Sequence, residues 1–188
     1  MASILNVAAY RFVAIADPAG VAGWLRDIAE ARDLKGSVLV APEGINLFLA
    51  GQPEDVHGII EDMGRDARFQ RMTPRFSHSH SRPFRRLRVK VKREIISFGG
   101  RTLAGNALRA ASVSPTTLRD WLRQGHDDAG RELVLLDTRN QQEVAFGSFK
   151  HAIKLPIDRF AMLPAALESQ RDALKGKAVV SFCTGGIR

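Results

Sequence analysis

The chain has 188 residues, of which 45% are apolar and 26% charged, and no apolar stretch approaches the ~20 residues that a membrane-spanning helix needs. This composition predicts one large or two small globular domains, with no transmembrane segment and no secretion signal. The single cysteine excludes an internal disulfide and agrees with a reducing cytoplasm. A net charge of +8 favours polyanionic partners, nucleic acid above all.

The first half alternates strand and helix signals. Residues 7–15 are rich in strand formers, and the Asp17-Pro18 pair that follows is typical of a helix start. Residues 37–41 and 47–50 predict two short strands around a tight turn at residues 42–46, and Pro53 opens a second helix. We expect Trp24 and Met63 to be core side chains of these helices.

Residues 86–92 alternate strictly between basic and apolar side chains, which predicts a fourth strand. The resulting βαββαβ order indicates a ferredoxin-like domain over residues 1–97. Basic side chains gather in and around this strand, at Arg82, Arg85, Arg86, Arg88, Lys90, Lys92 and Arg93. They either form a solvated face that discourages edge pairing or contact RNA phosphates; because like charges on one face repel, we favour RNA contact.

Residues 98–112 are rich in Gly, Ala and Ser and are expected to form a linker. Residues 113–188 then predict an α/β domain with a parallel sheet. A helix begins at Ser114, residues 133–137 form a continuous apolar strand, residues 161–174 a helix, and residues 177–182 a last buried strand.

The only cysteine, Cys183, follows that last strand, where parallel sheets place their binding crevices. The glycines after it allow backbone amides to converge on one point and stabilise a thiolate there. The alternative, a buried cysteine that acts as a small apolar side chain, is common, but the Cys-x-Gly-Gly-x-Arg pattern favours a reactive thiol.

CTGGIR resembles the active loop of rhodanese domains, and LLDTRNQQEVAFGSFKHAIKLPI resembles the segment that precedes it in that fold. With APEGINLFLAG and PFRRLRVKVKREIISFG, the whole chain resembles the rhodanese-related tRNA uridine(34) hydroxylases. The resemblance implies a ferredoxin-like domain followed by a rhodanese-like domain. It also implies tRNA as partner and molecular oxygen as co-substrate, although no cofactor site is identifiable in the sequence.

Carried over residue by residue, the resemblance implies that Cys183 is the catalytic residue. The loop that would surround its sulfur consists of Thr184, Gly185, Gly186, Ile187 and Arg188. Asp137 and Arg139 match the rhodanese Asp-x-Arg, either as supporting site residues or, the reading we favour, as a structural charged pair. Glu43 to Asn46 is interpreted as a turn. His78 and His80 are assigned to a polar surface loop and not to a metal site.

Family members continue past this arginine with a second cysteine, a helix and a further strand. We therefore expect the chain to be truncated after the active loop and, by itself, to have low activity. Three functions stay open: hydroxylation of wobble uridine in tRNA, sulfur transfer through a Cys183 persulfide, and a non-catalytic RNA-binding or regulatory role. The attached basic domain argues against sulfur transfer as the main role.

Overall fold

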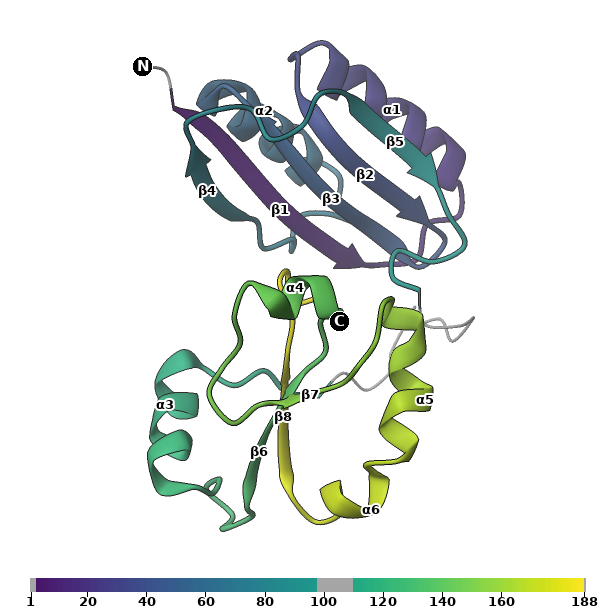
Figure 1. Cartoon of the computed structure of the whole chain (residues 1–188). Coiled ribbons are helices and arrows are strands. Elements are labelled where there is room, and N and C mark those ends of the chain that lie inside the picture. Colours follow the sequence, from purple (N-terminus) through teal and green to yellow (C-terminus); the bar gives the residue numbers. More distant parts are fainter. Residues whose placement is uncertain (1–2, 98–109, 188) are drawn as a thin grey trace. The chain divides into compact units, whose positions relative to one another are not determined.

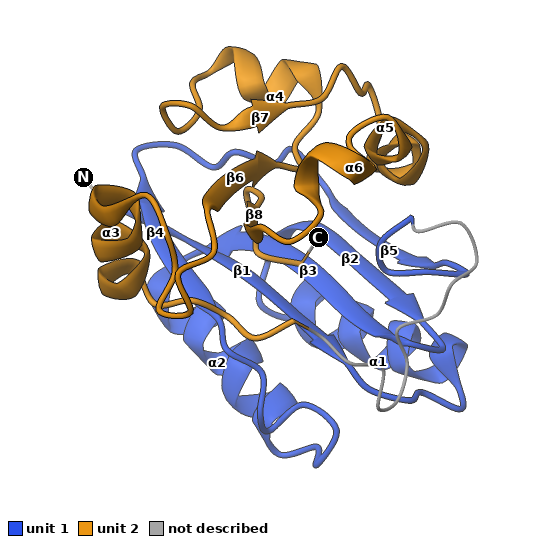
Figure 2. Cartoon of the chain, turned by 90° about the horizontal axis from the view of Figure 1, so that it is seen from below, with its two compact units in different colours: residues 1–107 blue, residues 108–188 orange. Residues whose placement is uncertain are grey.

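The computed structural model describes residues 3–97 and 110–187. It divides the chain into two compact units, residues 1–107 and 108–188 (Figure 2). The linker expected at residues 98–112 falls mostly on residues 98–109, which lie outside the described part of the chain.

The first unit is a five-stranded sheet with two helices packed on one face (Figure 1). Its strand order is β4-β1-β3-β2-β5, with β2 and β5 parallel and the other neighbours antiparallel. This arrangement confirms the ferredoxin-like class. The elements are β1 (Ile4–Phe12), α1 (Pro18–Glu30), β2 (Lys35–Ala41), β3 (Gly44–Gly51), α2 (Pro53–Gly64), β4 (Arg75–Ser79) and β5 (Leu87–Val91).

The basic segment does form a strand, as predicted, but its predicted place as the last strand of the βαββαβ order was wrong. The strand that completes the βαββαβ order is β4, and it contains His78, which was assigned to a loop. The basic segment forms β5, an additional strand that pairs in parallel with β2 at the opposite edge. The polar, largely exposed sequence of β4 carries no period-two signal, since an edge strand needs only backbone pairing to form. Val91, which shares a face of β5 with Leu87 and Val89, is 51% exposed at the end of the strand.

A side-chain cap starts α1, and a proline lies in the first turn of both helices. The Asp17 side chain accepts a hydrogen bond from the Gly20 N–H at 2.9 Å, and prolines occupy the first turns of α1 and α2. The apolar faces of the helices cover alternate residues of the strands, and Met63 is fully buried there. Trp24 packs against the same core and stacks on Phe69, with ring centroids 6.3 Å apart. Both expected core side chains are confirmed.

The turn between β2 and β3 is shorter than expected because β3 already begins at Gly44. Gly44 has a φ of +148°, and a Cβ there would lie 2.0 Å from the Arg11 carbonyl oxygen, so only glycine fits. The buried Glu43 accepts a hydrogen bond from the Ile95 N–H at 2.7 Å, and Asn46 Nδ2 lies 3.5 Å from the Ile95 carbonyl oxygen. The EGIN and KREI segments are therefore joined by side chain to backbone contacts.

The second unit has a three-stranded parallel sheet of order β7-β6-β8, as expected of a rhodanese-like α/β fold. Leu136, Leu155, Ile157 and Leu163 form its small core. Its elements are α3 (Pro115–Gln124), β6 (Leu133–Asp137), α4 (Gln141–Ala145), β7 (Ile153–Lys154), η1 (Phe160–Met162), α5 (Leu163–Glu168), α6 (Arg171–Leu174) and β8 (Ala178–Phe182).

The single helix expected at residues 161–174 is divided into η1, α5 and α6. Pro164 cannot donate a backbone hydrogen bond and fits only the first turn of an α-helix, so α5 begins at Leu163 after a 3-10 turn. The Ser169 hydroxyl then donates to the Ala166 carbonyl at 3.0 Å and competes with helix continuation. Within residues 3–97 and 110–187, no helix is both long and apolar enough to cross a membrane.

Replacing Glu43 by Ala should destabilise the first unit by about 1–3 kcal/mol, because the buried Ile95 N–H would lose its acceptor. Glu43→Gln retains a side-chain oxygen and should lose less. Urea unfolding followed by Trp24 emission in a Trp121→Phe background measures both. Equal unfolding midpoints for wild type and Glu43→Ala would show that the contact contributes nothing.

Candidate active site

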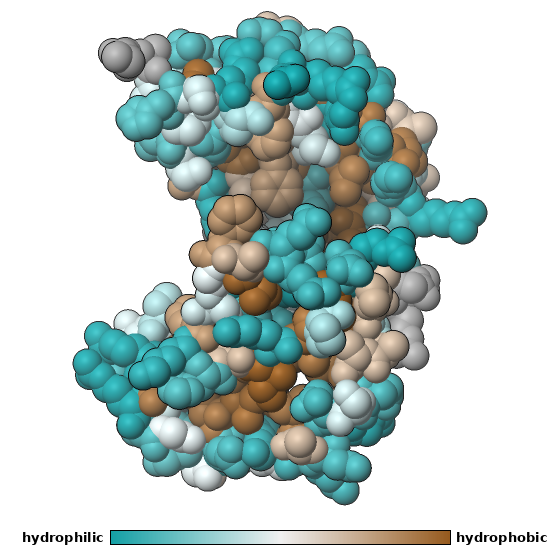
Figure 3. All heavy atoms as spheres, viewed as in Figure 1, coloured by the Kyte–Doolittle hydropathy of each residue, from teal (hydrophilic) through white to brown (hydrophobic). Residues whose placement is uncertain are grey.

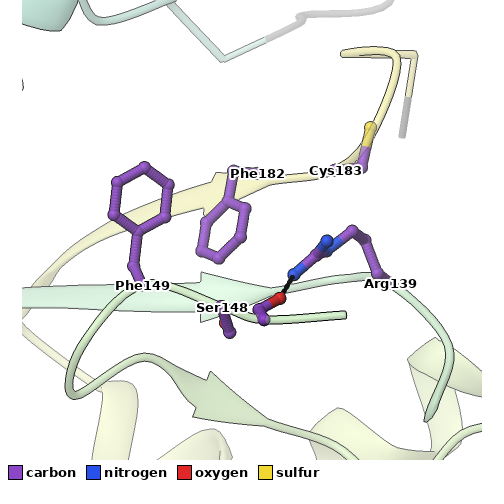
Figure 4. A pocket seen from close by; sticks show the side chains of 6 residues that line it. Arg139, Ser148, Phe149, Phe182 and Cys183 are labelled. Carbon is purple, nitrogen blue, oxygen red and sulfur yellow. Dashed lines mark hydrogen bonds between the residues drawn. The ribbon is translucent and has the colours of Figure 1, made fainter. Parts of the chain in front are cut away.

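Cys183 directly follows β8 and lines a pocket of about 410 Å³ at the carboxyl ends of the parallel strands (Figure 4). The pairing of β6 with β8 places Asp137 opposite Phe182, so the residues that follow each strand come together. Both the backbone N–H and the hydroxyl of Thr138 donate to the Phe182 carbonyl, at 3.1 and 2.8 Å. The lining residues are Arg139, Gly147, Ser148, Phe149, Phe182 and Cys183.

The loop after Cys183 bends back toward the sulfur. Gly186 has a φ of +74°, a conformation that favours glycine, and its N–H donates to Cys183 Sγ at 3.0 Å. Ile187 is buried and anchors the far side of the loop. Of the five residues expected to surround the sulfur, Thr184 to Ile187 are described and Arg188 lies outside the described residues. Cys183 is thus partly buried, accepts an amide hydrogen bond at its sulfur and lines the pocket.

Glu143 links this loop to α4. The Thr184 hydroxyl donates to Glu143 Oε1 at 2.7 Å, while Glu143 Oε2 accepts from the Asn140 N–H at 3.0 Å. The Asn140 side chain in turn accepts from the Glu143 N–H at 2.8 Å, which completes a capping box. One carboxylate therefore holds both the start of α4 and the active loop.

Asp137 and Arg139 form a two-point ion pair beneath the pocket. Arg139 Nε and Nη2 donate to Asp137 Oδ1 and Oδ2 at 2.9 and 2.8 Å, and the Ser148 hydroxyl donates to Oδ2 at 2.6 Å. Burial of the fully enclosed Asp137 opposes its ionisation, but the hydrogen bonds from Arg139 and Ser148 outweigh it and lower the pKa of the carboxyl. Arg139 Nη2 also donates to the Gly147 carbonyl at 2.6 Å.

The same arginine brings positive charge to the pocket. Its pKa is raised by the hydrogen bond to Asp137, and the nearby charges of Glu143 and Cys183 add to this effect. The Arg139 guanidinium lies 5.7 Å from the Phe182 ring centroid, and Phe149 meets Phe182 edge to face at 4.9 Å. The pocket therefore combines a thiol, a fixed cation and aromatic walls (Figure 4).

Sequence reasoning missed several residues of this site: Glu143, Gly147, Ser148, Phe149 and Phe182. The Asn140-x-x-Glu143 spacing is a capping-box signal that could have identified Glu143. Ser148 and Phe149 lie in an irregular segment without periodicity, so only the fold brings them to the pocket.

The basic residues of the first unit are not all equivalent. Arg82 pairs with Asp33 at 2.9 Å, so its charge is already compensated. The other six, from Arg85 to Arg93, are exposed, and no salt bridge to them occurs among the described residues. His78 Nδ1 lies 2.9 Å from the Ser3 hydroxyl, and within the described ranges no three His, Cys, Asp or Glu side chains gather as a metal site would require.

Asp137→Asn should destabilise the second unit by about 3 kcal/mol at pH 7, because it leaves Arg139 without its counter-charge. Because the folded-state pKa of Asp137 is lowered, its contribution is complete above the ordinary value of 3.8 and is lost as the pH falls below it. The stability difference between wild type and Asp137→Asn should therefore shrink between pH 4 and pH 3. Urea unfolding followed by Trp121 emission in a Trp24→Phe background measures it, and a constant difference would contradict the assignment.

Comparison with known proteins adds to this geometry. Residues 4–95 match the family described as the UPF0176 acylphosphatase like domain. A tRNA uridine(34) hydroxylase of Xanthomonas campestris pv. campestris strain B100 is 56% identical over 185 residues, which are 98% of this chain and 73% of that protein. The protein of the same name from Bordetella pertussis strain Tohama I is 50% identical over 188 residues, which are 100% of this chain and 77% of that protein.

These names favour hydroxylation over the sulfur-transfer and non-catalytic alternatives. Identity at this level over nearly the whole chain, together with the ferredoxin-like unit and the cysteine loop, establishes the relationship: the chain belongs to the tRNA uridine(34) hydroxylase family.

Proposed function

We propose that this protein is an enzyme that hydroxylates C5 of the wobble uridine of tRNA, with Cys183 as its catalytic residue. The observation that carries the proposal is the position of Cys183, a partly buried residue that lines an aromatic pocket on a chain 56% identical to a named tRNA uridine(34) hydroxylase. The reaction replaces the C5 hydrogen by hydroxyl, a two-electron oxidation for which the family resemblance implies molecular oxygen as oxidant. One oxygen atom enters the uracil ring and the other leaves as water, so an external two-electron reductant, such as a cellular thiol, must supply the remaining two electrons and two protons.

In this proposal the pocket receives the uracil ring. Phe149 and Phe182 provide apolar walls against which a planar base can lie, and the Gly186 N–H holds the Cys183 sulfur at the pocket, where it can act as a nucleophile. The Ser148 hydroxyl donates to Asp137, and Asp137 in turn accepts from Arg139. These contacts hold the Arg139 charge at the pocket that would receive the uracil ring. Asp137 is a positioning residue because it acts through Arg139.

The first unit would bind the tRNA. Its exposed basic side chains on and beside β5 can contact phosphates, and the counterions they release favour association. Arg82 is the least suited of the seven because it already pairs with Asp33. A tRNA substrate also places the enzyme in the cytoplasm, which agrees with the single unpaired cysteine.

Cys183→Ser should abolish formation of 5-hydroxyuridine in tRNA, because a hydroxyl does not ionise to an anionic nucleophile at neutral pH. The measurement is nucleoside analysis of tRNA from cells that lack the gene and are complemented with wild type or with the variant. An unchanged melting temperature of Cys183→Ser serves as the folding control.

If Cys183→Ser restored 5-hydroxyuridine as well as wild type does, the catalytic assignment would be wrong. A protein that transfers sulfur instead would turn over thiosulfate and cyanide through Cys183 and leave the level of 5-hydroxyuridine unchanged.

Replacing four basic residues of β5 and its flanks by glutamine should weaken tRNA binding and flatten its salt dependence. Loss of four phosphate contacts reduces the slope of log K against log salt concentration by about 3. The variant carries Arg86→Gln, Arg88→Gln, Lys90→Gln and Lys92→Gln. A matched control removes four exposed charges elsewhere, Arg65→Gln, Arg119→Gln, Arg123→Gln and Arg171→Gln, and should retain the wild-type slope. Equal slopes for all three proteins would exclude β5 as the phosphate contact.

A further inference from the structure

The sheet of the first unit has a face that α1 and α2 do not cover, which we call the open face. Alternate strand residues such as Val38, Leu47 and Leu49 point into the core beneath the helices, so their neighbours point to the open face. Phe48 is one of these outward residues. It lies on β3, the middle strand of the sheet, and is 38% exposed.

The two direct cross-strand neighbours of Phe48 have small side chains. Ala8 on β1 and Ser37 on β2 are its direct cross-strand neighbours, so neither covers the phenyl ring with a large group. One strand further out, the same row ends in Arg75 on β4 and Arg88 on β5. Since neighbouring strands lie about 4.8 Å apart, each arginine Cα is roughly 10 Å from that of Phe48.

The charges of the open face are of one sign. Its outward strand positions carry Lys35, Arg75, Arg88 and Lys90, and no acidic residue occupies an outward position of these five strands, which the structure describes in full. Lys35 pairs with Asp33 near the edge, whereas the other three cations have no carboxylate partner among the described residues. Figure 3 shows apolar atoms over the central strands of this unit with hydrophilic atoms around them.

We propose that the open face binds single-stranded RNA, with one base stacked on Phe48 and the phosphates on either side held by Arg75 and by Arg88 and Lys90. An exposed ring flanked by cations matches an unpaired nucleotide, whose flat base and charged phosphates need both features. A duplex hides its base faces, so it cannot use the ring. The proposal deepens the proposed function, on which its choice of tRNA rests, because it assigns unpaired nucleotides of the substrate to this surface.

The test compares Phe48→Ala, Phe48→Tyr and a control, Phe76→Ala, by fluorescence anisotropy with a labelled anticodon stem-loop RNA. Phe76 is 43% exposed on the same unit, but its pairing with the core residue Val7 places it on the helix-covered face. We expect Phe48→Ala to weaken binding about 5-fold or more, with Phe48→Tyr and Phe76→Ala within about 2-fold of wild type. Melting temperatures verify that the variants are folded.

Two further measurements separate stacking from charge. Phe48→Ala should retain the wild-type slope of log K against log salt concentration, because the ring contacts no phosphate, and should not weaken binding of a duplex RNA of equal length. An Arg88→Gln, Lys90→Gln variant should instead reduce the slope by about 1.4 on single strands. Unchanged single-strand affinity of Phe48→Ala, or an equal loss on duplex RNA, would overturn the proposal.

A polyglutamate competitor tests whether the face recognises an acidic polypeptide instead. If polyglutamate binds the wild-type protein as tightly as the RNA does, and Phe48→Ala weakens both interactions by the same factor, the occupant of the open face is not RNA. These assays measure RNA binding and not turnover. Their result therefore stays interpretable even if the hydroxylation experiment contradicts the proposed function. Conversely, if Phe48→Ala binds normally while Cys183→Ser abolishes 5-hydroxyuridine, only the stacking surface is lost.

Discussion

The parallel pairing of β6 with β8 is the constraint on which the candidate active site depends. It sets Asp137 opposite Phe182, and therefore brings the segment that starts at Thr138 beside the segment that starts at Cys183. The two hydrogen bonds from Thr138 to the Phe182 carbonyl continue this pairing past the end of β6. A slip of one residue would turn Asp137 to the other face and separate the Arg139 cation from the sulfur.

In each unit a buried carboxylate accepts hydrogen bonds from a segment outside the sheet. Glu43 accepts the Ile95 N–H and holds the segment after β5 against the β2–β3 turn. Asp137 accepts from the Arg139 backbone at 3.1 Å as well as from its side chain, and so fixes the loop after β6. In each unit a buried acceptor orders irregular backbone that the sheet hydrogen bonds do not reach.

How much could be predicted from the sequence depends on whether a feature is local. The caps at Asp17 and Ser114, the strand at Leu133–Asp137 and the position of Cys183 at a strand end were predicted correctly, since each depends on neighbours in the chain. Strand β4 was missed because its residues are largely exposed and its place is set by pairing with β1, about 70 residues away in the chain. Ser148 and Phe149 were missed for the same reason, since only the fold brings them beside Cys183.

The structure also separates the roles of the residues that carry the family resemblance. Glu43 and Asn46 form hydrogen bonds with the backbone of Ile95. Asp137 accepts hydrogen bonds from Arg139 and Ser148. Their presence in the motifs is explained by the structural contacts that they make. Cys183 differs because the hydrogen bond that it accepts from Gly186 closes its own loop, and the residue is only partly buried beside a pocket. A partly buried thiol that lines a pocket and is hydrogen-bonded within its own loop supports the proposal that Cys183 serves chemistry. That asymmetry, more than the match of the motif as a whole, is the physical argument for assigning the reaction to the thiol.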